Sequence, residues 1–232
     1  MIPFARMIKY GNVKGLPEAL VYLPMVNDFT NHGDSTNPLY SSVGLTVISA
    51  THGTIDGRTG LLCNGSQRIY YDEVVYADSS WSVSNWVYTT STANKAYINA
   101  SSNVGFSYNS GGNPNLVRNF YCVNSGSSTI AYYGSYSMPV GSWVHAVYTY
   151  DRDAKSLKFY ANGELKRTQT VPTFSSYGTG GSTGRMVGLG YYPGNISSTP
   201  LNGYISHHRL YRSVLSDEDV MLIYNYELGG AE

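Results

Sequence analysis

Acidic side chains are the groups here that could do hydrolytic chemistry, because cleavage of a glycosidic bond needs two carboxyl groups converging on it. The chain has 15 Asp and Glu residues, and they are scattered. Asp72 and Glu73 are adjacent in an expected strand, where neighbours project to opposite faces. Asp151 and Asp153 have the spacing of a turn, and residues 217–219 that of a first helical turn. Because no pair of acids is evident, we predict that the chain is not an enzyme.

Histidine, glycine and cysteine offer other candidate sites. His207 and His208 are adjacent in an expected strand, so one metal ion could not easily reach both, and we expect packed or solvent-exposed side chains. The run "GTGGSTGR" at 178–185 lacks the Lys-Ser/Thr ending of a phosphate-binding loop and indicates an ordinary loop. Cys63 and Cys122 have no metal-ligand spacing, and we expect both to be free, buried thiols.

Tyrosine is the unusual feature of the composition, with 23 residues beside 25 glycines. Such a composition suits strands, turns and surfaces that bind by stacking and hydrogen bonding. A sugar site would place aromatic faces beside amide and hydroxyl groups. Tyrosine is also a common strand residue, so a purely structural use of each one stays open. The candidate glycan-binding residues are Tyr108, Arg118, Tyr121, Tyr133, Tyr191 and Tyr192.

Charge and hydropathy exclude several partners. The 15 basic and 15 acidic residues give a formal net charge of +0, so no field attracts a phosphate backbone or an anionic membrane. No apolar run is long enough to span a membrane, and the first residues lack the apolar core of a signal peptide. We therefore expect neither nucleic acid nor an inserted membrane as a partner.

Short apolar or alternating segments recur from Leu20 onward, separated by Gly, Ser and Asn turns. We therefore expect strands to position the candidate side chains. That rhythm indicates an all-β sandwich or jelly roll. Asn162-Gly163 predicts a tight hairpin turn. Ser216 and Asp219 form a capping-box pattern that predicts one short C-terminal helix.

The chain divides into three expected parts. Residues 1–19 carry basic side chains and prolines without a clear period, which indicates an extended attachment arm. Residues 20–228 read as one domain without an internal boundary. Residues 229–232 form a short tail.

Four stretches within residues 20–228 resemble the concanavalin A-like lectin/glucanase superfamily in its laminin-G-like form. The resemblance is carried by Trp143 in an alternating strand, an Asp-rich turn, and Tyr160 before Asn162-Gly163. It implies a two-sheet antiparallel jelly-roll sandwich with one short C-terminal helix. Some enzymes of the superfamily have a Glu-x-Asp-x-x-Glu motif, which this chain lacks. The stretches are "VYLPMVNDF" (21–29), "SWSVSNWVYTTS" (80–91), "GSWVHAVYTYDRDAKSLKFYANGELK" (141–166) and "LNGYISHHRLYRSVLSDEDVMLIYN" (201–225).

The resemblance also implies a structural calcium ion, which would need several oxygen ligands from loops. Asp28 and Asp34 are the candidate ligands, although their spacing does not match an EF-hand loop.

The opening "IPFARMIKYGN" (2–12) resembles the first residues of tailed-phage structural proteins, which implies a location on a virion surface. One hypothesis is a non-catalytic glycan-binding or adhesion module that binds a cell-surface glycan. It would be a homo-oligomer attached to a virion or capsid protein through the 1–19 arm. A second is a purely structural capsid decoration or tail-accessory protein. A third is a glycosidase or polysaccharide lyase.

Overall fold

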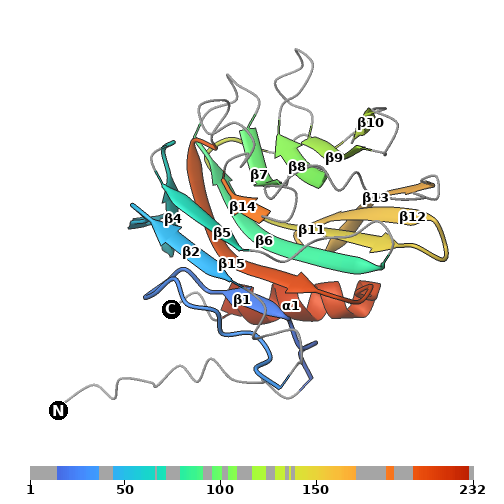
Figure 1. The fold of residues 1–232 in the computed structure, drawn as a ribbon, viewed down its shortest axis with the longest axis horizontal. Helices are drawn as coiled ribbons and strands as arrows, with labels where there is room; N and C mark the ends of the chain where they lie inside the picture. The colour runs from blue at the N-terminus through green and yellow to red at the C-terminus, as the bar shows by residue number, and fades with distance from the viewer. Residues whose placement is uncertain are drawn as a thin grey trace.

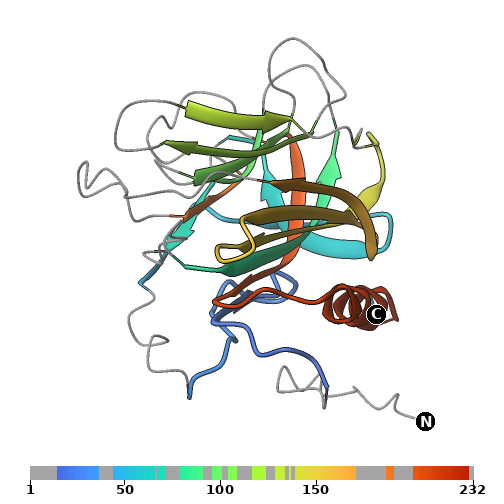
Figure 2. The same cartoon turned by 90° about the vertical axis from the view of Figure 1, so that its right-hand side faces the viewer.

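Two antiparallel β-sheets lie face to face in the computed structural model, and helix α1 (Asp217–Gly229) lies against the outer side of one of them (Figure 1, Figure 2). This confirms the predicted jelly-roll sandwich with one short C-terminal helix. The structure describes residues 15–36, 44–65, 67–71, 79–90, 96–100, 104–108, 117–123, 129–133, 136, 139–170, 187–190 and 201–229. No helix among them is long and apolar enough to cross a membrane.

Sheet A has eight strands and is built around β6 (Trp81–Thr89). This strand pairs with β11 (Trp143–Asp151) on one side and with β15 (Gly203–Tyr211) on the other. All nine residues of β6 are buried, so the centre of the sheet is covered on both faces. Beyond β11 the sheet is completed by β12 (Ser156–Ala161) and β13 (Glu164–Thr170). On the other side, β4 (Arg58–Cys63) and β1 (Val21–Leu23) pair with β15, and β3 (His52–Ile55) pairs with β4.

Sheet B has seven strands and consists of two parts that are distant in sequence. Four consecutive strands form one half as a meander, and β14 joins them to β5 and β2. In order across the sheet the strands are β10 (Thr129–Tyr133), β9 (Val117–Val123), β8 (Val104–Tyr108), β7 (Ala96–Ala100), β14 (Val187–Leu189), β5 (Arg68–Tyr71) and β2 (Leu45–Ile48).

The hairpin between β12 and β13 forms as predicted. Asn162 and Gly163 have φ angles of 53° and 79°, the left-handed values that a two-residue hairpin turn requires. The Asn162 side chain also accepts a 2.9 Å hydrogen bond from the backbone N–H of His145. At the other end of β12, the Asp151 carboxylate accepts bonds from the backbone N–H groups of Asp153 and Ala154, which confirms the predicted turn.

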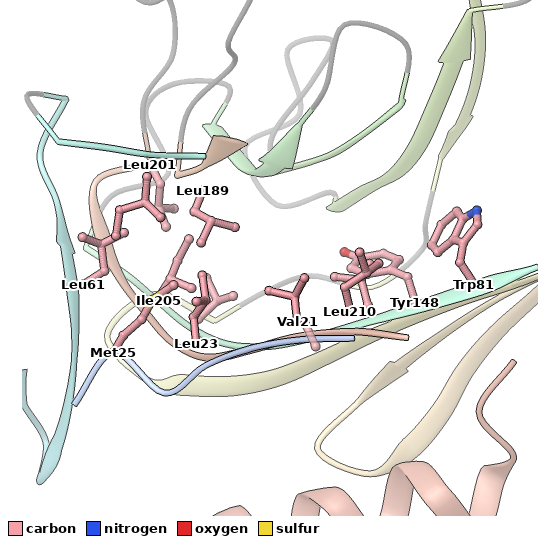
Figure 3. Packing of buried hydrophobic residues seen from close by; sticks show 14 of the residues in the cluster. Val21, Leu23, Met25, Leu61, Trp81, Tyr148, Leu189, Leu201, Ile205 and Leu210 are labelled. Atoms are coloured by element: carbon pink, nitrogen blue, oxygen red, sulfur yellow. The ribbon is translucent and has the colours of Figure 1, made fainter. Parts of the chain in front are cut away.

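The main core fills the space between the sheets (Figure 3). Strand alternation sends every second residue of β6 and β11 into it, including Trp81 and Tyr148. β1 adds Val21 and Leu23, and sheet B adds Leu189, each 0% exposed. Burial of this apolar surface is the main force that holds the two sheets together.

Helix α1 starts at the predicted capping box. The Ser216 hydroxyl accepts a 3.1 Å bond from the N–H of Asp219, and the Asp219 carboxylate accepts a 3.0 Å bond from the N–H of Ser216. Val220 and Ile223 are buried against sheet A, as the helical spacing requires. The sequence therefore fixes where the helix begins and which side it buries.

We expect Gly203→Ala to lower the free energy of unfolding by about 3 kcal/mol, because the new methyl group would force β15 and β6 apart. A Cβ at Gly203 would lie 1.8 Å from the backbone oxygen of Tyr88. Both Gly203, with a φ of 154°, and Gly57, with a φ of 76°, have positive φ angles that side chains disfavour, but nothing lies within 4 Å of a Cβ added at Gly57. Gly57→Ala is thus a matched control, and its free energy of unfolding should fall by only about 1 kcal/mol, the cost of an alanine in the left-handed conformation. Denaturant unfolding followed by Trp fluorescence compares them, and equal losses would contradict the packing argument.

Candidate functional site

The outer face of sheet A is covered by α1 and by the segment that leads into β1. A second apolar cluster, separate from the main core, lies between them and the sheet. Leu16 packs against its edge. In the part of the chain that the structure describes, the centre of this face is therefore closed to a ligand. The cluster consists of Ala19, Tyr22, Val147, Tyr160, Tyr211, Leu215, Val220 and Ile223.

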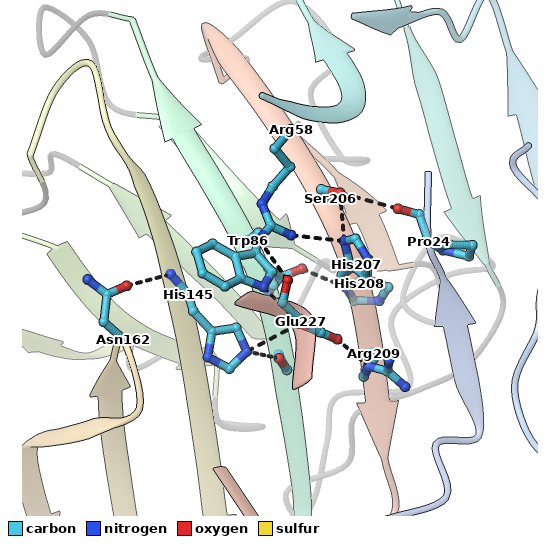
Figure 4. A network of polar contacts seen from close by, with 12 residues as sticks. Pro24, Arg58, Trp86, His145, Asn162, Ser206, His207, His208, Arg209 and Glu227 are labelled. Atoms are coloured by element: carbon cyan, nitrogen blue, oxygen red, sulfur yellow. Dashed lines mark hydrogen bonds and ion pairs between the residues drawn. The ribbon is translucent and has the colours of Figure 1, made fainter. Parts of the chain in front are cut away.

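A buried polar network lies beside this cluster, with Glu227 of α1 at its centre (Figure 4). Arg209 Nε donates to Glu227 Oε1 at 2.7 Å, and Trp86 Nε1 donates to Oε2 at 2.8 Å. Arg58 Nη2 donates to the Glu227 backbone carbonyl at 3.0 Å, and its guanidinium stacks 3.8 Å from the centroid of the Trp86 ring. The Glu227 side chain is 0% exposed, so this carboxylate is fully removed from water.

Two histidines, His145 on β11 and His207 on β15, lie beside this network, and His208 lies on the other face of β15; all three are buried. His145 Nε2 lies 2.8 Å from the Ser84 hydroxyl and 3.7 Å from Glu227 Oε2. His207 and His208 point to opposite sides of sheet A, as predicted for adjacent strand residues. The ring of His207 lies beside Arg58 and Ser206 on the helix side.

His208 belongs to the space between the sheets. Its two ring nitrogens lie 2.8 Å from the Tyr71 hydroxyl and 2.7 Å from Asn85 Oδ1. Both adjacent histidines are thus packed side chains with protein partners, as expected, and they cannot share one ligand.

Burial and neighbouring cations decide the charges in this region. Burial, together with Arg209 and Arg58, lowers the pKa of His145 to about 3, so its contact with Glu227 is made by a neutral ring at neutral pH. Burial raises the pKa of Glu227, while the Arg209 guanidinium opposes that rise. Burial alone would lower the pKa of Arg209, but the Glu227 carboxylate raises it. Arg209 and Glu227 therefore compensate one another.

This network lacks the features of a hydrolytic site. It holds one carboxylate, whose oxygens are engaged by Arg209 and Trp86 and covered by α1, whereas glycoside hydrolysis needs two accessible acids. We interpret it as the attachment of α1 to sheet A. Sequence reasoning missed it, although the signal was present: Glu227 is four residues after Ile223 and seven after Val220, on the helix face that is otherwise apolar.

The register of sheet B assigns its residues to an inner and an outer face. Leu189 is buried in the main core and pairs with Asn99, which pairs with Phe106. Directly paired residues belong to the same face, so position 106 is an inner position. Its neighbours Gly105 and Ser107 then belong to the outer face, turned away from sheet A.

From these two positions, two outer rows can be followed across the strands. The first row consists of Tyr133, Arg118, Ser107 and Tyr97, each paired with the next. In the second row, Tyr121 lies between the small residues Ala131 and Gly105, and the row continues through Ala100 and Gly188 to Tyr70.

The register thus assigns three of the predicted glycan-binding positions, Arg118, Tyr121 and Tyr133, to the outer face of sheet B. A β-bulge in β9, between the positions paired with Gly105 and Ser107, is what brings Arg118 and Tyr121 to one face although they are three residues apart. Tyr108 follows an outer position and therefore belongs to the inner face. Tyr97 and Tyr70 are outer positions that sequence reasoning missed, because no local pattern distinguishes them from other strand tyrosines.

The structure does not assign the remaining predicted site residues to this face. Tyr191 and Tyr192 lie outside the described residues. Asp28 Oδ1 accepts bonds from the N–H and hydroxyl of Thr30, and His32 Nε2 lies 3.0 Å away. Asp34 Oδ1 accepts the same two bonds from Thr36.

These contacts make two local turns. Among the described residues, no group of three or more His, Cys, Asp or Glu side chains could hold a metal ion together. Calcium would need six to eight oxygen ligands, so the two aspartates alone do not form a site. The predicted calcium ion stays a prediction.

Comparison with protein families gives a match to this chain. A laminin G family model, described as the concanavalin A-like lectin/glucanases superfamily, matches residues 64–221, which is more than half of the chain. A comparison with curated proteins found no match.

Solved structures with the same fold include domain 4 of an extracellular arabinanase from Geobacillus stearothermophilus in complex with arabinotriose. It is 21% identical with a TM-score of 0.62, over 90% of this chain and 100% of that one. The botulinum neurotoxin serotype D ligand binding domain in complex with N-acetylneuraminic acid is 17% identical, TM-score 0.65, over 91% and 51%. The neurotoxin DC binding domain with rat synaptotagmin II is 14% identical, TM-score 0.64, over 90% and 51%. The chain thus spans about half the length of these neurotoxin structures. At these identities the likeness establishes the fold.

Because His145 and His208 are buried in the neutral form, we expect the protein to lose stability in acid. Burial lowers the pKa of His145 and His208 to about 3, against about 6.5 in an unfolded chain. Below about pH 6.5 the unfolded chain binds protons that the folded protein does not. The contribution of these histidines to the free energy of unfolding is therefore fully present above that pH and falls toward pH 3. Each histidine contributes a slope of about 1.4 kcal/mol per pH unit.

Calorimetric melting temperatures measured from about pH 7 down to about pH 4.5 test this linkage. We expect a steady fall, with a shallower slope in His208→Gln, which has no ionisable ring at this position. Identical slopes in the two proteins would rule out His208 as a source of the acid sensitivity.

Proposed function

The chain belongs to the concanavalin A-like lectin/glucanases superfamily, and from that premise we propose that it is a glycan-binding module that does not cleave its ligand. The proposed binding surface is the outer face of sheet B. The observation that supports it is the contrast between the sheets: α1 covers the outer face of sheet A, whereas the outer rows of sheet B contain Tyr133, Arg118, Tyr97 and Tyr121.

These residue types suit a sugar ligand. Tyrosine rings can stack on the C–H faces of a pyranose or furanose and donate hydrogen bonds through their hydroxyl groups. An arginine can bind ring hydroxyls or a carboxylate with two parallel N–H groups. Tyr133 and Tyr97 are three strand spacings apart, about 14 Å, which suits an oligosaccharide better than one sugar. Tyr121 is paired with the small residues Ala131 and Gly105.

Both neutral and acidic sugars belong in the first set of ligands tested. Structures of the same fold were determined with arabinotriose and with N-acetylneuraminic acid. Arg118 would favour an acidic sugar, whereas the tyrosines would serve either class.

We expect the purified chain to bind members of a glycan array at near-micromolar sensitivity. Tyr121→Ala and Arg118→Ala should each weaken binding about tenfold, which corresponds to the loss of one stacking or charged hydrogen-bonding contact. Tyr226→Ala is the matched control, because Tyr226 is 37% exposed on α1, far from sheet B in the fold. The affinity of this variant for the glycan should equal that of the unchanged protein. Calorimetric titration measures all three.

A blank array would contradict glycan binding and favour the purely structural alternative. Turnover of any polysaccharide would contradict the absence of catalysis and favour a glycosidase or lyase. Running the array once with Ca²⁺ and once with EDTA tests whether glycan binding depends on the proposed calcium ion. An EDTA-sensitive signal that Asp34→Asn abolishes would support a calcium site at Asp28 and Asp34.

We also propose a location on a particle surface, a phage virion, with the 1–19 arm attached to a virion or capsid protein and the chain present as a homo-oligomer. This part of the proposal is supported by the resemblance of residues 2–12 to tailed-phage structural proteins. Deleting residues 1–15 should abolish incorporation into particles while circular dichroism still reports a folded domain. Normal incorporation of the truncated chain would exclude attachment through the arm.

A further inference from the structure

The half of helix α1 that is turned away from sheet A carries exposed apolar side chains, on both sides of Glu218 and Asn225. Four large apolar side chains lie on it, at exposures that are high for residues of this size: Met221 39%, Leu222 42%, Tyr226 37% and Leu228 52%. An amphipathic helix at a protein surface normally presents charged residues on this side. We call these four residues the outer α1 face.

The start of the described chain lies beside this helix. Leu16 packs against the cluster that contains Val220 and Ile223 of α1. Residues 1–14 are therefore attached to a part of the chain on the same side of sheet A as the helix. Extended, they could reach about 46 Å, whereas the 13 residues of α1 span only about 20 Å.

The composition of this tethered segment is complementary to the helix. "MIPFARMIKYGNVK" contains the apolar residues Ile2, Phe4, Met7 and Ile8, three basic residues and no acid. Helix α1 contains no basic residue, and its first turn holds Asp217, Glu218 and Asp219. Asp217 is already bound by Lys158, and Asp219 caps the helix, which leaves exposed Glu218 near the outer α1 face.

We propose that residues 1–14 dock on the outer α1 face of their own chain, with apolar side chains over Leu222 and Tyr226 and basic side chains toward Glu218. Tethering makes a weak contact sufficient, because a short linker gives an effective concentration in the millimolar range. An arm attached to a particle would leave this face, so the docked state belongs to the free protein. The inference does not depend on glycan binding.

Maleimide labelling of a cysteine at position 222 tests the proposal. The background is Cys122→Ser, and Cys63 remains because burial raises the pKa of its thiol and makes it unreactive. In dilute full-length protein, Leu222→Cys should label about tenfold more slowly than in the same variant lacking residues 1–14, the ratio expected when nine arms in ten are docked. Ala154→Cys, in the exposed turn after β11, is the matched control and should label equally in both.

A second variant keeps the arm and weakens only the contact. Glu218→Lys should accelerate labelling of Leu222→Cys in the full-length chain and should have no effect after truncation. Equal labelling with and without residues 1–14 would overturn the proposal. Slow labelling in both would also overturn it, since something other than the arm would then cover the helix. Protection that disappears on dilution would assign the docked arm to a second copy instead.

Discussion

The carboxylate of Glu227 has no access to water, and much of the architecture follows from how its charge is compensated. Arg209 on β15 supplies the opposite charge, and Trp86 on β6 supplies the second hydrogen bond. Removing one partner of a buried ion pair typically costs about 3–5 kcal/mol, because the other charge is left without solvent or counter-ion. Helix α1 therefore cannot leave sheet A without breaking this network, which joins β6, β15 and the helix. Val220 and Ile223 bury apolar surface against the sheet, and the ion pair between Arg209 and Glu227 fixes the position of the helix on it.

Anchoring at both ends makes the helix a permanent cover for sheet A. At its start, Asp217 accepts bonds from Lys158 and Tyr160, and Ser216 forms the capping box. At its end, Glu227 binds the centre of the sheet. The central strands β6 and β11 are consequently buried on both faces, and the polar side chains Ser84, Trp86 and His145 on them contact protein groups. This division of roles leaves the outer face of sheet B as the surface on which recognition is proposed.

Sequence patterns predicted the local structures well where the cause is local. The Asn162-Gly163 turn needs two left-handed residues, and the capping box needs Ser216 and Asp219 three positions apart, so adjacent letters suffice for both. His207 and His208 have the opposite orientations that strand alternation predicts, although they lie in a β-bulge of β15 that also brings Ser206 beside His207. Face assignments within sheet B could not be read in this way. Arg118 and Tyr121 are three residues apart, which predicts opposite faces in a regular strand, yet the bulge in β9 brings them to the same one.

The sequence by itself determined the fold class, the tight turns, the start of α1 and its inward apolar stripe, because these depend on residues within a few positions of each other. Tertiary structure alone decided which tyrosines share the outer face, since a register shift in one strand changes the face of every residue beyond it. It also decided that Glu227 is a buried structural acid and that the outer face of sheet A is closed. Those outcomes depend on Trp86, Arg209 and α1 meeting across a sequence separation of 141 residues between Trp86 and Glu227, which no local pattern encodes.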